Sequence, residues 1–266
     1  MRHAACSGVV NSGVNASGRI GTRAGNVSEP IKSIERHFMT LTVFLRVLVR
    51  YAAMIVGLWI AVSQPASAQE KKELEVDGNT VTAMTMGQGD HAVILVHGVH
   101  YLRGEYFFHE YGAFLGNGLA RAGFRVLAPY WTYEAGSFSG FRKIDTVLKH
   151  ALASGAKKVS IVGMSLGGEL VANFAKTRPD ATFDTLIELS SVNDAGHSQP
   201  TTKKLFVFLE GDGFARWQPK AFDASVEPKQ MIRIEGSGHA IRDLVKKKSD
   251  LLDSLVATLN ASGGTK

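Results

Sequence analysis

Cysteine is almost absent from this sequence, since Cys6 is the only one among 266 residues. Cys6 lies in a leader that we expect to be removed, so the mature chain would form no disulfide and no thiolate metal site. A chain without thiols is compatible with an oxidising compartment. The sequence also has no H-x-x-x-H motif. We therefore expect no bound metal and no other cofactor.

The sequence also lacks an apolar run of the about 20 residues that a membrane span requires. The longest uninterrupted apolar run extends from 52 to 62, and Arg46 and Arg50 interrupt any longer window. Positive residues followed by such a run are typical of a secretory signal peptide, and Ala66 and Ala68 form the A-x-A pattern that signal peptidase cleaves. We predict cleavage after Ala68 rather than a retained anchor. The mature protein would then be secreted or periplasmic, without a stable membrane span.

The same features divide the chain into three parts. Residues 1–38 are rich in Gly, Ser, Asn and Arg and have no apolar periodicity, so we interpret them as disordered or as a wrongly assigned extension before a true start at Met39. Residues 39–68 form the predicted signal peptide. The remaining 198 residues, 69–266, are enough for one domain with its own core.

An excess of charge is also missing once the leader is set apart. The whole chain carries a net charge of +6, but residues 1–68 hold 7 of the 30 basic and 2 of the 24 acidic residues. The leader therefore carries +5 and residues 69–266 only +1. A nearly neutral domain gives no electrostatic reason to bind nucleic acid, and we expect no such partner.

Within residues 69–266, short apolar runs alternate with segments of helical spacing. We predict strands at 74–76, 81–86, 92–96, 124–128, from 159 to the glycine turn at 163, at 185–189, 205–209 and 231–234, and helices at 110–122, 144–153, about 166–176 and 241–259. This order predicts an α/β fold, with a mostly parallel central sheet and helices on both faces. Ligands of such sheets bind beyond the carboxyl ends of the strands, so the strand-to-helix loops are the places to look for chemistry.

The loop after the strand from 159 has the form G-x-S-x-G, with Ser165 between Gly163 and Gly167. A serine on a sharp strand-to-helix turn is lifted clear of the sheet beside a helix N-terminus, where its hydroxyl suits a nucleophile. The alternative is a glycine-rich loop in which Ser165 only caps the following helix.

A second loop, His97-Gly98-Val99-His100, follows the strand at 92–96. The glycine lets the backbone bend, so that the N–H of Val99 could join the N–H of Leu166 in an oxyanion hole. The alternative is an ordinary tight turn with a packed histidine.

Two further loops hold a candidate base and a candidate acid. His239 follows a glycine turn after the last strand and lies downstream of Ser165, as a general base would. His197 lies in a polar loop and remains a second candidate. Asp212 follows the strand at 205–209, where its carboxylate could orient an imidazole or simply form an acidic turn.

The chain from about Asp90 onward resembles the α/β-hydrolase superfamily. The resemblance rests on H-G at 97–98, G-x-S-x-G-G at 163–168 and G-x-G-H at 236–239, each at a strand end and in the family's order. It implies that Ser165 is the nucleophile and that His239 is the general base. It also implies a covalent acyl-serine intermediate that water hydrolyses.

The acid is the first departure from the family pattern. Many relatives have H-G-x-x-D after the strand that supplies the acid, but the corresponding position here is Phe214. Asp212 is our first choice because it lies just past the strand end, and Glu210 is the second. Asp194 is the third, because some relatives place the acid after the preceding strand.

The second departure is the lid. Only about fifteen residues, 190–204, connect the strands at 185–189 and 205–209, too few for a helical cap. We therefore expect a lidless or minimal-cap member with a shallow pocket. Aromatic residues in two loops would either line an apolar acyl site or pack over a small core: Tyr101, Tyr106, Phe107, Phe108, Tyr130, Trp131, Tyr133 and Phe138. Arg103 and Arg142 would either contact an anionic substrate or be ordinary exposed arginines.

These observations favour a serine hydrolase that acts on a small-molecule ester or thioester. A peptidase or amidase would use the same three residues, because they do not encode the leaving group. A non-catalytic binding protein on a hydrolase scaffold is the alternative from another class.

Overall fold

The computed structural model describes residues 46, 48–49, 69–98, 112–131, 137–180, 182–239 and 241–261. The chain divides into two units, residues 1–63 and 64–266. In the first unit only Arg46, Leu48 and Val49 are described, and they are helical. No helix within the described residues is both long and apolar enough to cross a membrane. The predicted start at Met39 and the cleavage site at Ala68 lie outside the described residues.

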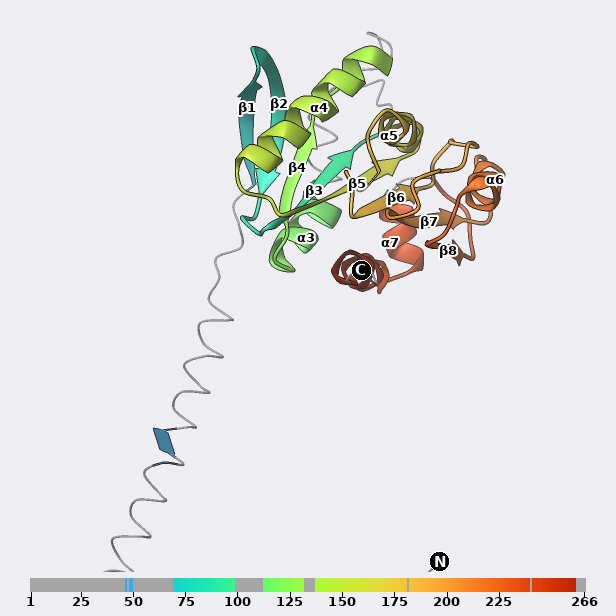
Figure 1. Cartoon of the computed structure of the whole chain (residues 1–266). Coiled ribbons are helices and arrows are strands. Elements are labelled where there is room, and N and C mark those ends of the chain that lie inside the picture. The colour runs from blue at the N-terminus through green and yellow to red at the C-terminus, as the bar shows by residue number, and fades with distance from the viewer. Residues whose placement is uncertain are drawn as a thin grey trace, which may run out of the picture. The chain divides into compact units, whose positions relative to one another are not determined.

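The second unit is built on one sheet of eight strands in the order β1-β2-β4-β3-β5-β6-β7-β8 (Figure 1). The first two strands and the β2–β4 pair are antiparallel, and all pairs from β4 to β8 are parallel. The strands are β1 (Glu70–Val76), β2 (Asn79–Met86), β3 (His91–Val96), β4 (Arg125–Pro129), β5 (Lys158–Met164), β6 (Thr185–Leu189), β7 (Lys203–Leu209) and β8 (Lys229–Ile234). The predicted mostly parallel sheet is confirmed.

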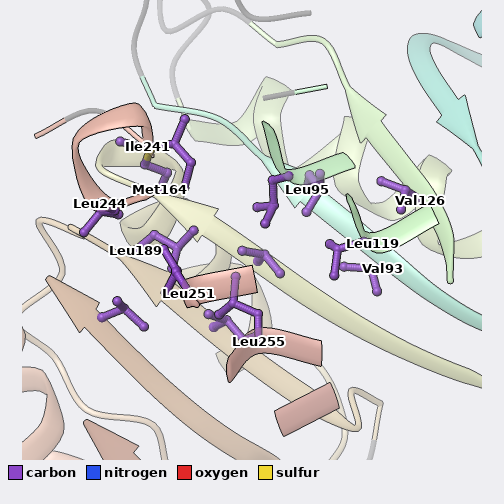
Figure 2. Packing of buried hydrophobic residues seen from close by; sticks show 14 of the residues in the cluster. Val93, Leu95, Leu119, Val126, Met164, Leu189, Ile241, Leu244, Leu251 and Leu255 are labelled. Atoms are coloured by element: carbon purple, nitrogen blue, oxygen red, sulfur yellow. The ribbon is translucent and has the colours of Figure 1, made fainter. Parts of the chain in front are cut away.

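Helices cover both faces of this sheet. Side chains alternate between the faces, so that Val93 and Leu95 of β3 contact one core while Ile94 and Val96 contact the other. The first core is closed by η1 (Gly112–Gly116), α3 (Asn117–Arg121), α7 (Ile241–Lys247) and α8 (Leu251–Asn260). Figure 2 shows the side chains that α3, α7 and α8 contribute to it: Leu119, Ile241, Leu244, Leu251 and Leu255. The second core is closed by α4 (Ser137–Ala153) and α5 (Leu166–Lys176). This two-sided burial explains the uninterrupted apolar runs of the central strands.

Three predicted helices differ from the observed ones. The helix predicted at 110–122 is a π-helical turn, η1, followed by α3, and the helix predicted from 144 already begins at Ser137. The predicted C-terminal helix is two helices, α7 and α8. Its break lies at Lys248–Asp250, where the ammonium group of Lys248 bonds to the Asp250 carboxylate and Leu251 N donates to Lys248 O. Ser and Asp favour such local turns over a helix interior.

Helix α6 (Trp217–Ala224), between β7 and β8, was not predicted from the sequence. It buries only Gln218 and Ala221, so it has no apolar stripe that would reveal it. Pro219 lies in its first turn, where a proline does not disturb a helix.

The register of the parallel strands brings the candidate loops to one edge. Val96 pairs with Gly163, Met164 with Leu189, and Leu209 with Ile234. The loops after β3, β5, β7 and β8 therefore leave the sheet side by side at its carboxyl edge.

Candidate active site

Ser165 forms the turn between β5 and α5 with a strained backbone. Its φ of 53° and ψ of −124° place a non-glycine residue in a sparsely populated region. Backbone hydrogen bonds on both sides hold Ser165 there: Ser165 N donates to Leu189 O at 3.0 Å, and Gly168 N donates to Ser165 O at 2.9 Å. Strain of this kind persists only where the surroundings fix the backbone, and it is concentrated at functional sites.

The glycines around Ser165 are required by close backbone approach. A Cβ on Gly163 would lie 2.5 Å from Gly167 O, and one on Gly167 would lie 2.2 Å from His97 O. A Cβ on Gly98 would lie 2.9 Å from the Cβ of Ser165. The G-x-S-x-G and H-G motifs therefore fit against each other, and the β3 loop lies directly beside the serine.

Ser165, His239 and Asp212 form a continuous hydrogen-bonded chain. Ser165 Oγ and His239 Nε2 lie 2.8 Å apart, and His239 Nδ1 lies 2.8 Å from Asp212 Oδ2. The Ser165 side chain makes no capping hydrogen bond to α5, so the alternative of a simple helix cap does not describe it. The His239 side chain is 35% exposed, whereas that of Asp212 is 1% exposed.

The buried Asp212 carboxylate is held in its ionised form. Burial raises the pKa of Asp212. The hydrogen bonds from His239 and from the Phe214 amide together lower the pKa by a larger amount, so that it lies below its ordinary value. An ionised carboxylate on Nδ1 fixes the imidazole tautomer that leaves Nε2 free to accept a proton. Of the other candidate acids, Glu210 and Asp194 are exposed, and neither bonds to His239 among the described residues.

Two contacts of His239 were not predicted from the sequence. The Phe214 ring packs against the His239 ring at a tilt of 50°, with centroids 4.9 Å apart, although the Phe214 side chain is 45% exposed. It occupies the position where relatives would have Asp, and it covers the ring instead. Asp243, in the first turn of α7, accepts a 3.2 Å hydrogen bond from His239 N. An acidic residue in a first helical turn is the signal that could have indicated this contact.

Of the two predicted oxyanion donors, Leu166 lies among the described residues and Val99 does not. Leu166 is the first residue of α5, so helix geometry leaves its N–H without an intrahelical acceptor, right beside Ser165. Val99 lies outside the described residues. His97 is buried and packs beside the rings of Tyr130 and Trp131, and the Trp131 indole N–H donates to His97 O at 3.1 Å. The His97 side chain is thus a packed histidine that anchors the loop.

Of the aromatic residues predicted to line a pocket, Trp131 is buried in the core beneath α4, and Tyr130 is half-buried. Arg142 is exposed on α4. The remaining predicted lining side chains lie outside the described ones: Tyr101, Arg103, Tyr106, Phe107, Phe108, Tyr133 and Phe138.

A buried polar cluster behind the site contains the second candidate histidine. His197 Nε2 lies 2.5 Å from Glu188 Oε1, and both side chains are 0% exposed. Asn193 Nδ2 donates to the same oxygen, and Gln218 Nε2 donates to Glu188 Oε2. His197 thus contacts Glu188 and not Ser165. A glutamate inside the apolar strand TLIEL is the sequence signal that this cluster offered.

No cap helix lies between β6 and β7, where residues 190–202 form an irregular loop. Within the described part of the chain, no cluster of three His, Cys, Asp or Glu side chains is placed to hold a metal ion.

No known sequence family and no curated protein matches the chain, whereas solved structures do. A "predicted CIB-like hydrolase" from Thermoplasma acidophilum matches with a TM-score of 0.54 and 19% identity, over 73% of this chain and 98% of its own. Est1E from Butyrivibrio proteoclasticus matches with a TM-score of 0.57 and 14% identity, over 72% and 99%. An arylesterase matches with a TM-score of 0.60 and 13% identity, over 84% and 96%. Together with the sheet order, these matches show that the chain has the α/β-hydrolase fold.

Proposed function

We propose that the protein is a serine hydrolase that cleaves a carboxylic ester or thioester through an acyl-serine intermediate. The observation that carries this proposal is the continuous chain from Ser165 Oγ through His239 to the buried Asp212 carboxylate. Esterases, an arylesterase and a monoacylglycerol lipase among the solved structures of this fold support an ester as the substrate.

In the first half of the reaction, His239 Nε2 takes the proton of Ser165 as Oγ attacks the carbonyl carbon. The carbonyl π electrons move to the oxygen, and the resulting oxyanion accepts hydrogen bonds from the amides of Leu166 and Val99. The intermediate collapses, the C–O or C–S bond to the leaving group breaks, and His239 gives its proton to the departing alcohol or thiol.

In the second half, His239 takes a proton from water while the water oxygen attacks the acyl carbon. Collapse of the second tetrahedral intermediate releases the carboxylic acid and returns the proton to Ser165. Asp212 stays ionised throughout, orients the ring and stabilises the imidazolium that forms in each half.

Nitrophenyl esters of graded chain length test this proposal on the purified protein. We expect hydrolysis by the wild type and a loss on the order of 1,000-fold or more in Ser165→Ala and His239→Ala. His150→Ala is the matched control, because His150 lies on α4 and bonds only to Ser154 among described residues. A Ser165→Ala variant as active as the wild type would refute the mechanism. Cleavage of anilides without cleavage of esters would favour an amidase. If neither substrate is cleaved, the alternative of a non-catalytic binding protein is favoured.

We also propose that residues 39–68 are a signal peptide and that the mature protein is secreted or periplasmic. Sequencing the N-terminus of the protein from its native host should give Gln69 as the first residue. A mature chain that retains residues 39–68 would contradict this proposal.

A further inference from the structure

A cavity of about 270 Å³ lies between the start of β2 and the first turns of α4. Residues 78–81 line one side, and Ser139, Arg142 and Lys143 line the other. Pockets for drug-sized ligands begin at about 300 Å³, so this cavity suits a small group rather than a long acyl chain. Its lining holds two basic residues and no acidic one.

The two basic residues of the cavity differ from their neighbour on the same helix. Lys149 lies 2.7 Å from Asp77 and 3.3 Å from Asp145, so its charge is compensated. Among the described residues, Arg142 and Lys143 form no ion pair. The lining of the cavity therefore includes two basic residues that no carboxylate of the described residues contacts directly.

Lys143 is also partly desolvated. Burial lowers the pKa of Lys143, and the charge of Glu73 only partly offsets this. Glu73 itself accepts a 2.5 Å hydrogen bond from Thr82 Oγ1. The ammonium group of Lys143 lies 5.6 Å from the centre of the Tyr130 ring. A charge removed from water gains more from a nearby anion than an exposed one does.

The cavity is connected to the serine by a short series of contacts. Tyr130 N donates to the carbonyl oxygen of Thr82, next to the cavity residues of β2, at 2.9 Å. The Tyr130 ring stacks on His97 with centroids 6.1 Å apart. His97 precedes Gly98, which packs against Ser165. These contacts connect the strand that lines the cavity to the turn that carries Ser165.

We propose that this cavity, the β2–α4 pocket, binds a carboxylate or phosphate group through Arg142 and Lys143. The guanidinium of Arg142 can bind two oxygens of such a group at once, and Lys143 adds a point charge. The anion is either a distal acidic group of the substrate or a free oxyanion, and the two sources share this chemistry.

Calorimetric titration of the full chain carrying Ser165→Ala with inorganic phosphate and with glutarate tests the site without turnover. We expect both anions to bind, and at least tenfold weaker binding in Arg142→Gln/Lys143→Gln. Lys149→Gln, on the same helix, is the control and should bind as before. Arg142→Gln alone, at an exposed position, keeps the test valid if the double variant fails to fold. No binding by the parent protein, or undiminished binding in both Arg142 variants, would overturn the proposal.

Kinetics with Ser165 intact distinguish the two sources. If the anion belongs to the substrate, nitrophenyl monoesters of glutarate should have a lower KM than neutral esters of equal length, and Arg142→Gln should remove only that advantage. Equal KM values together with phosphate binding would assign the pocket to a free oxyanion. If no ester is hydrolysed, the proposed function fails while the titration still decides on the pocket.

Discussion

Ser165 is held in a strained backbone conformation by hydrogen bonds from two neighbouring elements. Its G-x-S-x-G motif could be recognised in the sequence because the close approach of β5, α5 and the β3 loop excludes any side chain at the flanking glycines. The acid could not be chosen with the same certainty. Asp212 and His239 are 27 residues apart, and only the folded loops show that Asp212 rather than Glu210 reaches Nδ1.

At the residue scale, we predict that Asp212→Asn lowers kcat on the order of 10,000-fold, because the amide would hold His239 in the wrong tautomer. Glu210→Gln and Asp194→Asn should keep near wild-type activity, since both residues are exposed and the His239 ring bonds to Asp212 and Ser165 instead. Steady-state kinetics of the three variants check this. Full activity in Asp212→Asn with loss in either of the others would move the acid to that residue.

At the scale of the elements, β6 supports the serine turn from behind. Ser165 N donates to Leu189 O at the end of β6, and Val192 N in the following loop lies 3.4 Å from Ser165 O. The Glu188 carboxylate ties that loop to the strand through Asn193 and His197. Strand β6 was predicted from its apolar run, but this pairing was not, because burial of a glutamate depends on partners brought from other elements.

Glu188→Ala should therefore destabilise the protein by about 3–5 kcal/mol, because it leaves His197 Nε2 buried without its acceptor and removes one of the two acceptors of Asn193 Nδ2 and of Gln218 Nε2. Glu210→Ala is the matched control at an exposed position and should change the free energy of unfolding by less than about 0.5 kcal/mol. Urea unfolding of both variants measures the difference. A loss below about 1 kcal/mol in Glu188→Ala would mean that the cluster adds little to stability.

The whole domain shows which features of a sequence determine a fold. Apolar runs such as 92–96 predicted the strands, and the alternation of these runs with helical segments predicted that helices cover both faces of the sheet. Helix α6 and the break at Lys248–Asp250 escaped prediction because local polar contacts, rather than a periodic apolar face, determine them. The candidate site lies at the carboxyl edge of the sheet, while the ion pairs of Asp184 with Lys158 and Lys203 lie at the starts of β5, β6 and β7, at the opposite edge.

Acid should weaken the whole fold through one of those pairs. Burial raises the pKa of Asp184. The hydrogen bonds from Lys203 and Thr185 together lower the pKa by a larger amount, so that it lies below its ordinary value. As the pH falls, the Asp184 carboxylate therefore takes up its proton in the unfolded chain before it does so in the folded protein. The stabilisation is complete above the ordinary carboxyl pKa, and it is lost as the pH falls from roughly 5 through the native pKa.

Unfolding titrations across this range should show a steeper loss of stability in the wild type than in Asp184→Asn. Near pH 7, the free energies of unfolding of the wild type and of Asp184→Asn should differ by a constant amount. Parallel curves down to pH 3 would contradict the assignment of this acid sensitivity to Asp184.

The proposed reaction requires that Ser165 is a nucleophile activated by His239. Incubating the folded protein with a fluorophosphonate, followed by mass spectrometry of the intact chain and of its peptides, measures this directly. We expect one adduct per chain on Ser165, none in Ser165→Ala and much slower labelling in His239→Ala. An unlabelled wild-type protein, or equal labelling of Ser165→Ala, would contradict it.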